Sequence, residues 1–153
     1  MNNTLTNKIK LSVVVPIRKG SERSKNKNIK QFTSDGQSLT ELKIKELLKI
    51  EKVDEIILTT DDEIAISQIK KLAERTKKLK IIRRPDNLCQ STTLVKDLIN
   101  YMPTITMSDH ILWLHVTSPF VKAEDYEDAI EKYSQALENG YDSIMSVTEH
   151  KQF

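Results

Sequence analysis

Residues 18–30 contain the side chains in this sequence that are best suited to binding a polyphosphate. These thirteen residues carry six basic side chains and one acidic side chain. Arg18 offers a planar guanidinium fork, and Lys27 offers a point charge. Ser21 and Asn28 add short neutral groups that can hydrogen bond to phosphate oxygens. Because Lys-rich runs are commonly solvated loops, a loop without a ligand is the competing interpretation.

The residues before this basic loop predict a buried strand. Val13–Val15 form a short β-branched apolar run, and Pro16 and Gly20 then interrupt it. In α/β proteins, a buried strand that leads into a Gly-containing basic loop presents phosphate-binding groups at the carboxyl end of a sheet. The loop is not a Walker A motif, because no Gly-Lys-Ser/Thr tripeptide occurs in the sequence.

The rest of the chain alternates between apolar runs and amphipathic segments. Further strands are expected at 54–60, 79–82, 110–116 and 141–147. Helices are expected at 39–52, 65–73, 94–102 and 126–137. This alternation predicts a single α/β domain over residues 1–153, with a mostly parallel, Rossmann-like sheet between two layers of helices.

Polar residues follow the predicted strands at the points where each strand ends. Besides the basic loop, these residues are Asp61, Arg84, Thr117 and Ser118. The carboxyl ends of parallel strands meet at one edge of a sheet, where α/β proteins bind their ligands. We therefore expect these residues to converge on one rim, although they lie far apart in the sequence.

Four residues near the ends of the predicted strands also have structural interpretations. Asp61 and Asp62 could hold a metal or a ribose hydroxyl, or could cap the helix that follows them. Arg84 could line a pocket because Pro85 fixes the chain after it, or Arg83 and Arg84 could be surface arginines. His115 could hydrogen bond to a ligand or lie within an apolar core.

Four segments resemble the acylneuraminate cytidylyltransferase family, whose members make CMP-activated nonulosonic acids. They are Arg18-x-Gly20-Ser21-x(5)-Lys27-Asn28-Ile29, Thr59-Thr60-Asp61, Arg84-Pro85-x(2)-Leu88 and Thr117-Ser118-Pro119. Glu22 and Arg23 replace the usual Lys-Gly of the first segment, and His115 replaces a Gln before the last one. The resemblance covers nearly the whole chain and implies the fold of nucleotide-diphospho-sugar transferases.

The resemblance also implies an activity, in which CMP passes from CTP to a nonulosonic sugar acid and pyrophosphate is released. The implied catalytic residues are Arg18 and Lys27. The implied nucleotide-binding residues are Arg18, Gly20, Ser21, Lys27, Asn28, Arg84, Thr117 and Ser118. Asp61 and His115 are candidates for substrate binding. Alternatives are another sugar or cofactor nucleotidyltransferase, and a nucleotide-binding or assembly module without catalysis.

The resemblance further implies Mg²⁺ as a cofactor and a homodimer as an assembly. In the family, the acidic metal ligands, the sugar contacts and the dimerisation segment come after the point that matches Val147. No metal ligand is therefore identified in this chain. We expect these 153 residues to bind nucleotide but to turn it over slowly, as a C-terminally truncated member of the family would.

Composition narrows the choice of partners and compartment. A net charge of +2 from 24 basic and 22 acidic residues does not favour nucleic-acid binding. The single Cys89 fits a reducing compartment. The apolar run at 11–17 is too short for a signal peptide core or a membrane span. A cytoplasmic protein is expected.

Overall fold

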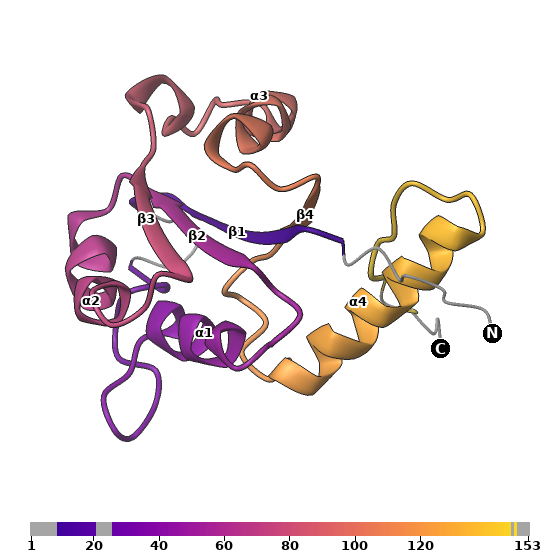
Figure 1. Ribbon diagram of the computed structural model, residues 1–153. Helices are drawn as coiled ribbons and strands as arrows, with labels where there is room; N and C mark the ends of the chain where they lie inside the picture. Colours follow the sequence, from indigo (N-terminus) through magenta and orange to yellow (C-terminus); the bar gives the residue numbers. More distant parts are fainter. Residues whose placement is uncertain (1–8, 21–25, 148, 150–153) are drawn as a thin grey trace.

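A four-stranded sheet forms the centre of the molecule, and each strand runs parallel to its neighbours (Figure 1). The computed structural model describes residues 9–20, 26–147 and 149. The strand order is β3-β2-β1-β4, so β1 and β2 are central. The strands are β1 Leu11–Ile17, β2 Glu55–Thr60, β3 Leu79–Arg83 and β4 His110–Trp113.

Helices cover both faces of this sheet, as the sequence predicts. The α-helices are α1 Leu39–Leu48, α2 Glu63–Ala73, α3 Val95–Tyr101 and α4 Ala123–Glu138. Short 3₁₀ helices lie at Asp86–Leu88 and Met102–Ile105. In Figure 1, α1 and α2 lie on one face and α3 lies on the other. The three-layer, parallel α/β architecture is confirmed.

Alternate residues of the central strands supply the two halves of the core. Val13 and Val15 pack in the larger cluster, with apolar residues of α1, α2 and α4. Val14 and Ile57 face the other way and pack with Met102, next to side chains of α3. Both faces of the central strands are therefore buried, which explains their continuous apolar sequence.

Side-chain caps set where the first two helices begin. The Ser38 hydroxyl accepts a bond from the Glu41 amide, and the Glu41 carboxylate accepts one from the Ser38 amide. Asp62 caps α2 through bonds from the amides of Ile64 and Ala65. The expected helix at 39–52 is wrong at its end, because α1 stops at Leu48. The Ile50 amide bonds to the Leu47 carbonyl at 3.2 Å instead, and the chain tightens there and turns towards β2.

The expected fifth strand at 141–147 is wrong. The part of the chain that the structure describes contains no backbone ladder that includes these residues. The Tyr141 amide bonds to the Ala136 carbonyl, and Gly140 has a φ of 83°, so the chain turns back at the end of α4. Strand β4 is also shorter than expected, and residues 114–116 belong to the loop that follows it.

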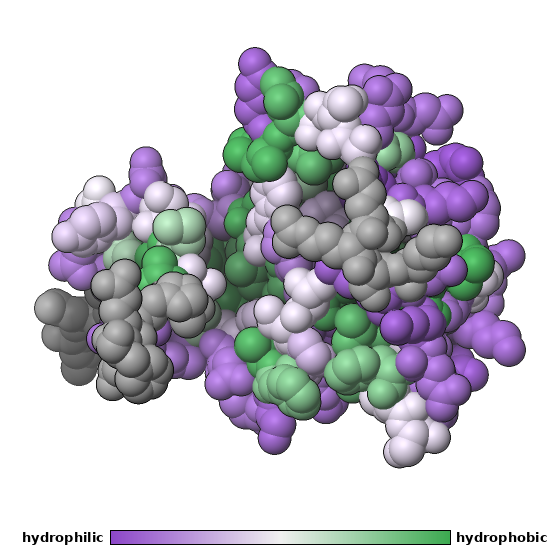
Figure 2. Space-filling model, turned by 180° about the vertical axis from the view of Figure 1, so that it is seen from behind, coloured by the Kyte–Doolittle hydropathy of each residue, from purple (hydrophilic) through white to green (hydrophobic). Residues whose placement is uncertain are grey.

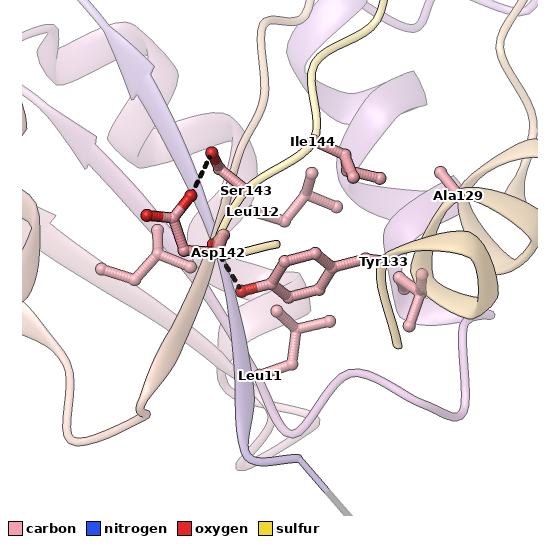
Figure 3. A pocket seen from close by; sticks show the side chains of 9 residues that line it. Leu11, Leu112, Ala129, Tyr133, Asp142, Ser143 and Ile144 are labelled. Carbon is pink, nitrogen blue, oxygen red and sulfur yellow. Dashed lines mark hydrogen bonds between the residues drawn. The ribbon is translucent and has the colours of Figure 1, made fainter. Parts of the chain in front are cut away.

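Residues 142–144 line a cavity of about 150 Å³ with β4 and α4. Figure 3 shows Tyr133 beside this cavity, with its hydroxyl donating to the Asp142 carbonyl at 3.4 Å. In Figure 2, apolar surface lines the hollow between the part that carries α4 and the rest of the molecule. Leu11, the first residue of β1, also lines the cavity, which therefore lies at the amino end of the sheet.

Candidate functional site: the rim at the carboxyl ends of the strands

The residues that follow β1, β2 and β3 meet at one edge of the sheet. The Lys19 amide, after β1, donates to Asp61 Oδ1, after β2, at 2.7 Å. The Arg84 amide, after β3, donates to the Thr60 carbonyl at 3.0 Å. The predicted convergence of these strand ends is therefore present, and we call this edge the rim. The cavity near Tyr133 lies at the opposite end and is not part of it.

Arg84 is buried at the rim, with only 3 % of its surface exposed. Its Nη2 donates to the Thr59 carbonyl at 2.9 Å, and its Nε has no partner among the described residues. Burial lowers the pKa of the Arg84 guanidinium, because water no longer surrounds the charge. The interpretation as a surface residue is therefore wrong for Arg84. It is correct for Arg83, which is exposed and pairs with Glu63.

The two aspartates after β2 have different roles. Asp62 is buried, and its Oδ1 accepts bonds from the amides of Ile64 at 3.0 Å and Ala65 at 3.4 Å. The helix-cap interpretation is therefore correct for Asp62. Asp61 is half-buried and fixes the start of the basic loop through the Lys19 amide. A carboxylate thus remains at the rim, next to the proposed phosphate ligands.

The basic loop is anchored at both of its described ends. Gly20 has a φ of 72°, a left-handed conformation that glycine adopts without strain. Further along, the Asn28 carbonyl accepts bonds from the Thr40 amide at 3.1 Å and the Thr40 hydroxyl at 2.7 Å. These bonds tie the loop to the first turn of α1. Ser21 lies outside the described residues.

Three residues of this loop have groups that could face a ligand. Lys27 is half-buried, and its charge acts on His115 across the rim. Asn28 Oδ1 is buried and has no partner in the described part of the chain. Arg18 is half-buried directly after β1. Of these groups, the Lys27 charge lies close enough to act on a residue at the exit of β4.

The loop after β4 supplies the remaining candidates. Thr117 and Ser118 are exposed, and so is His115, whose ring lies 5.9 Å from that of Trp113. Partial loss of hydration and then the nearby Lys27 charge lower the pKa of His115. The interpretation of His115 as a core residue is wrong, because His115 is exposed whereas its neighbours Leu114 and Val116 are buried. A neutral imidazole that can accept or donate a hydrogen bond remains at the rim.

Lys43 is the rim-associated residue that the sequence interpretation missed. It lies in α1, is 0 % exposed, and bonds to the backbone of the loop after β4. The spacing of Leu39, Lys43 and Leu47 could have revealed it. Residues four apart share one helix face, and both leucines are buried.

The predicted Mg²⁺ has no ready-made set of protein ligands in the part of the chain that the structure describes. No group of three or more His, Cys, Asp or Glu residues lies close enough there to hold a metal ion. Asp62 is used as a helix cap, and one oxygen of Asp61 accepts the Lys19 amide. These residues alone do not make a metal site, and Mg²⁺ stays a prediction.

Comparison with known proteins identifies the family of this chain. The family model described as cytidylyltransferase matches residues 12–152. The chain belongs to the cytidylyltransferase family. The matched range includes β2, β3, β4, all of β1 except Leu11, and the rim residues described above. No helix among the described residues is long and apolar enough to span a membrane.

Two curated relatives are pseudaminic acid cytidylyltransferases from Campylobacter jejuni subsp. jejuni. The one from serotype O:2 is 28 % identical over 123 residues, and the one from serotype O:23/36 is 29 % identical over the same length. Each match covers 80 % of this chain and 52 % of the relative. The chain thus spans about half the length of these relatives.

Solved structures with the same fold include other cytidylyltransferases. A CMP:2-keto-3-deoxy-manno-octonic acid synthetase in complex with CTP matches with a TM-score of 0.63 and 19 % identity, covering 82 % of this chain and 48 % of that one. A cytidylyltransferase from Leptospira borgpetersenii serovar Hardjo-bovis matches with a TM-score of 0.57 and 17 % identity, covering 83 % and 50 %. At these identities the likeness establishes the fold.

Proposed function

We propose that this chain binds CTP at the rim, and that the whole protein transfers CMP to a nonulosonic sugar acid. The observation that supports this most is the meeting of a basic loop, Asp61 and the buried Arg84 at one sheet edge. In a parallel α/β sheet this edge is where ligands bind. The family assignment favours a cytidine nucleotide, and the pseudaminic acid relatives favour a nonulosonic acid as acceptor.

In the proposed reaction, the anomeric hydroxyl of the sugar acid attacks the α-phosphorus of CTP. A new phosphorus–oxygen bond forms, the bond to the bridging α–β oxygen breaks, and pyrophosphate leaves while the hydroxyl proton passes to solvent. Such a reaction needs charge neutralisation and alignment more than a covalent nucleophile. Arg18 and Lys27 would neutralise the triphosphate, and Ser21 and Asn28 would donate hydrogen bonds.

Other rim residues would position the remaining parts of the two substrates. Arg84 would border the pyrimidine, and Thr117 and Ser118 would add hydroxyls from the loop after β4. Asp61 and His115 would contact a sugar or ribose hydroxyl. Mg²⁺, when bound with CTP, would lower the charge barrier to attack.

Base selectivity provides a test of the role of Arg84. Arg84→Ala should reduce the preference for CTP over ATP more than it weakens inhibition by pyrophosphate. Arg83→Ala is the matched control, because Arg83 is adjacent but exposed and paired with Glu63. An equal loss of affinity for every ligand in Arg84→Ala would assign this residue to phosphate binding or to folding instead.

The function itself is tested by titrating the chain with CTP, UTP, ATP and GTP, with and without Mg²⁺. The proposal predicts that CTP binds most tightly. Tighter binding of another nucleotide would favour a different nucleotidyltransferase. Release of pyrophosphate in the presence of CTP and a panel of nonulosonic acids then separates an enzyme from a binding module, and this assay should use the whole protein.

A further inference from the structure

The ammonium group of Lys43 is fully enclosed between α1 and the loop that connects β4 to α4. Its Nζ donates to the Ser118 carbonyl at 2.8 Å, the Val121 carbonyl at 2.8 Å and the Tyr126 hydroxyl at 2.9 Å. The same Nζ lies 4.9 Å from the centre of the Tyr126 ring. All three ammonium protons therefore have acceptors, as a buried lysine requires.

These contacts fix the second half of the loop, whereas Leu114 and Val116 anchor its first half by packing in the core. The Ser118 carbonyl also accepts the Val121 amide at 3.3 Å, so Lys43 completes a turn over residues 118–121. One turn along α1, Glu46 Oε2 accepts the Ala123 amide at 3.3 Å, at the start of α4. Two side chains of α1, Lys43 and Glu46, therefore hold the loop after β4 and the start of α4.

Burying the Lys43 ammonium costs free energy of hydration, which indicates that its hydrogen bonds have a role beyond filling space. An enclosed ammonium loses its hydration, and that loss lowers the pKa of Lys43. A leucine or methionine on the same helix face would fill the space without that cost. What an apolar side chain cannot do is set the direction of the Ser118 and Val121 carbonyls.

We propose that Lys43 is a positioning residue, which holds the backbone of residues 117–121 so that the exposed Thr117 and Ser118 stay at the rim. This inference rests on the proposed function for its link to CTP. Lys43 itself is 0 % exposed and would not touch the nucleotide. It would act through the loop, in the way that supporting residues hold a binding site in its productive geometry.

The test compares Lys43→Met with Ile44→Ala, two changes at adjacent buried positions of α1. Ile44 is 0 % exposed and packs in the core, but no hydrogen bond joins its side chain to the loop. Both variants should unfold more easily than the wild type. At a temperature where all three are folded, Lys43→Met should weaken CTP binding about ten-fold, and Ile44→Ala less than about two-fold.

Hydrogen exchange of the backbone amides provides a readout that does not depend on CTP. In Lys43→Met, residues 118–123 should exchange faster, while β1 and β2 keep the wild-type pattern. Tyr126→Phe removes only one of the three acceptors, and should shift both readouts in the same direction by about three-fold or less. This milder variant tests the idea even if Lys43→Met does not fold.

The outcomes separate this inference from the proposed function. If the wild type does not bind CTP, the proposed function fails, and exchange at 118–123 alone decides the inference. If the wild type binds CTP, equal affinities in Lys43→Met and Ile44→Ala would overturn it. Unchanged exchange at 118–123 in both Lys43→Met and Tyr126→Phe would overturn it in either case.

Discussion

Strands β1 and β2 and the segment 141–147 were all expected to be strands, but their surroundings differ. Val13–Val15 and Ile56–Leu58 are 0 % exposed, and helices cover both faces of their strands. In the segment 141–147, Met145 and Val147 are more than 80 % exposed. The apolar runs of β1 and β2 form strands because adjacent strands pair with their backbone and helices pack on both of their faces. The segment 141–147 pairs with no strand among the described residues and leaves Met145 and Val147 uncovered, and it is irregular.

The starts of the helices also differ in how they are stabilised. Helices α1 and α2 begin with side chains that accept backbone amides, from Ser38 and Asp62. Helix α4 begins directly after Lys122, whose side chain makes no capping bond in the described structure, and Asp125 accepts the Lys122 amide instead. The beginning of α4 is therefore held both by Asp125 within the helix and by Lys43 and Glu46 of α1.

Truncation of a central strand residue should have the largest effect. Ile57→Ala should lower the free energy of unfolding by about 2–5 kcal/mol, because the side chain is fully buried between the sheet and Met102. Val147→Ala, at an exposed position, should change it by less than about 0.5 kcal/mol. Urea unfolding measures both values, and similar losses would mean that the segment 141–147 is packed.

Alkaline pH should test the burial of Tyr126, the residue of α4 whose hydroxyl accepts a bond from Lys43 of α1. Burial raises the pKa of Tyr126 from 10.0 to about 12. Below pH 10.0 the phenol is neutral in both states, and between pH 10.0 and about 12 the unfolded state loses its proton first. Stability should therefore fall across this window, by about 1–2 kcal/mol from this group, because solvent screens part of the shift at the half-buried phenol.

Tyr126→Phe should remove that part of the pH dependence. Tyr141→Phe is the control, because this phenol lies in the exposed segment after α4. The measurement is the free energy of unfolding at several pH values from 9 to 12. An identical slope in the wild type and Tyr126→Phe would show that the Tyr126 hydroxyl is not buried against Lys43.

The smallest of these effects should come from the helix starts. Asp62→Ala should lower stability by about 1 kcal/mol, because two amides of α2 lose their acceptor. Lys122→Ala should cost only a few tenths of a kcal/mol, since no capping bond from its side chain is described. Thermal unfolding of both variants checks the difference, and a larger loss in Lys122→Ala would reverse the comparison.

The sequence was sufficient to predict the sheet and most of the rim. Alternating apolar and amphipathic segments predicted a mostly parallel sheet, and the rule for strand ends then predicted that the basic loop, Asp61 and Arg84 lie together. Those predictions needed only local patterns. The expected strand at 141–147 failed because pairing depends on a neighbour that the local pattern does not specify.

Burial of charged side chains was the part that local patterns could not predict. Arg83 and Arg84 are adjacent and chemically identical, yet one is exposed and the other is 3 % exposed. The alternation of side chains at the end of β3 decides which one turns inward. Lys43 likewise depends on the acceptors that the loop after β4 brings to it.

The most direct test of the CTP site is calorimetric titration of the wild type, Arg18→Ala, Lys27→Ala and Lys30→Ala with CTP. Loss of Arg18 or Lys27 should weaken binding by about ten-fold or more, because each would remove a charge-assisted contact to phosphate. Lys30 is exposed in the same basic loop, so its loss should have a much smaller effect. Equal affinities in all four proteins, or equal losses in all three variants, would contradict a specific triphosphate site and favour a solvated loop.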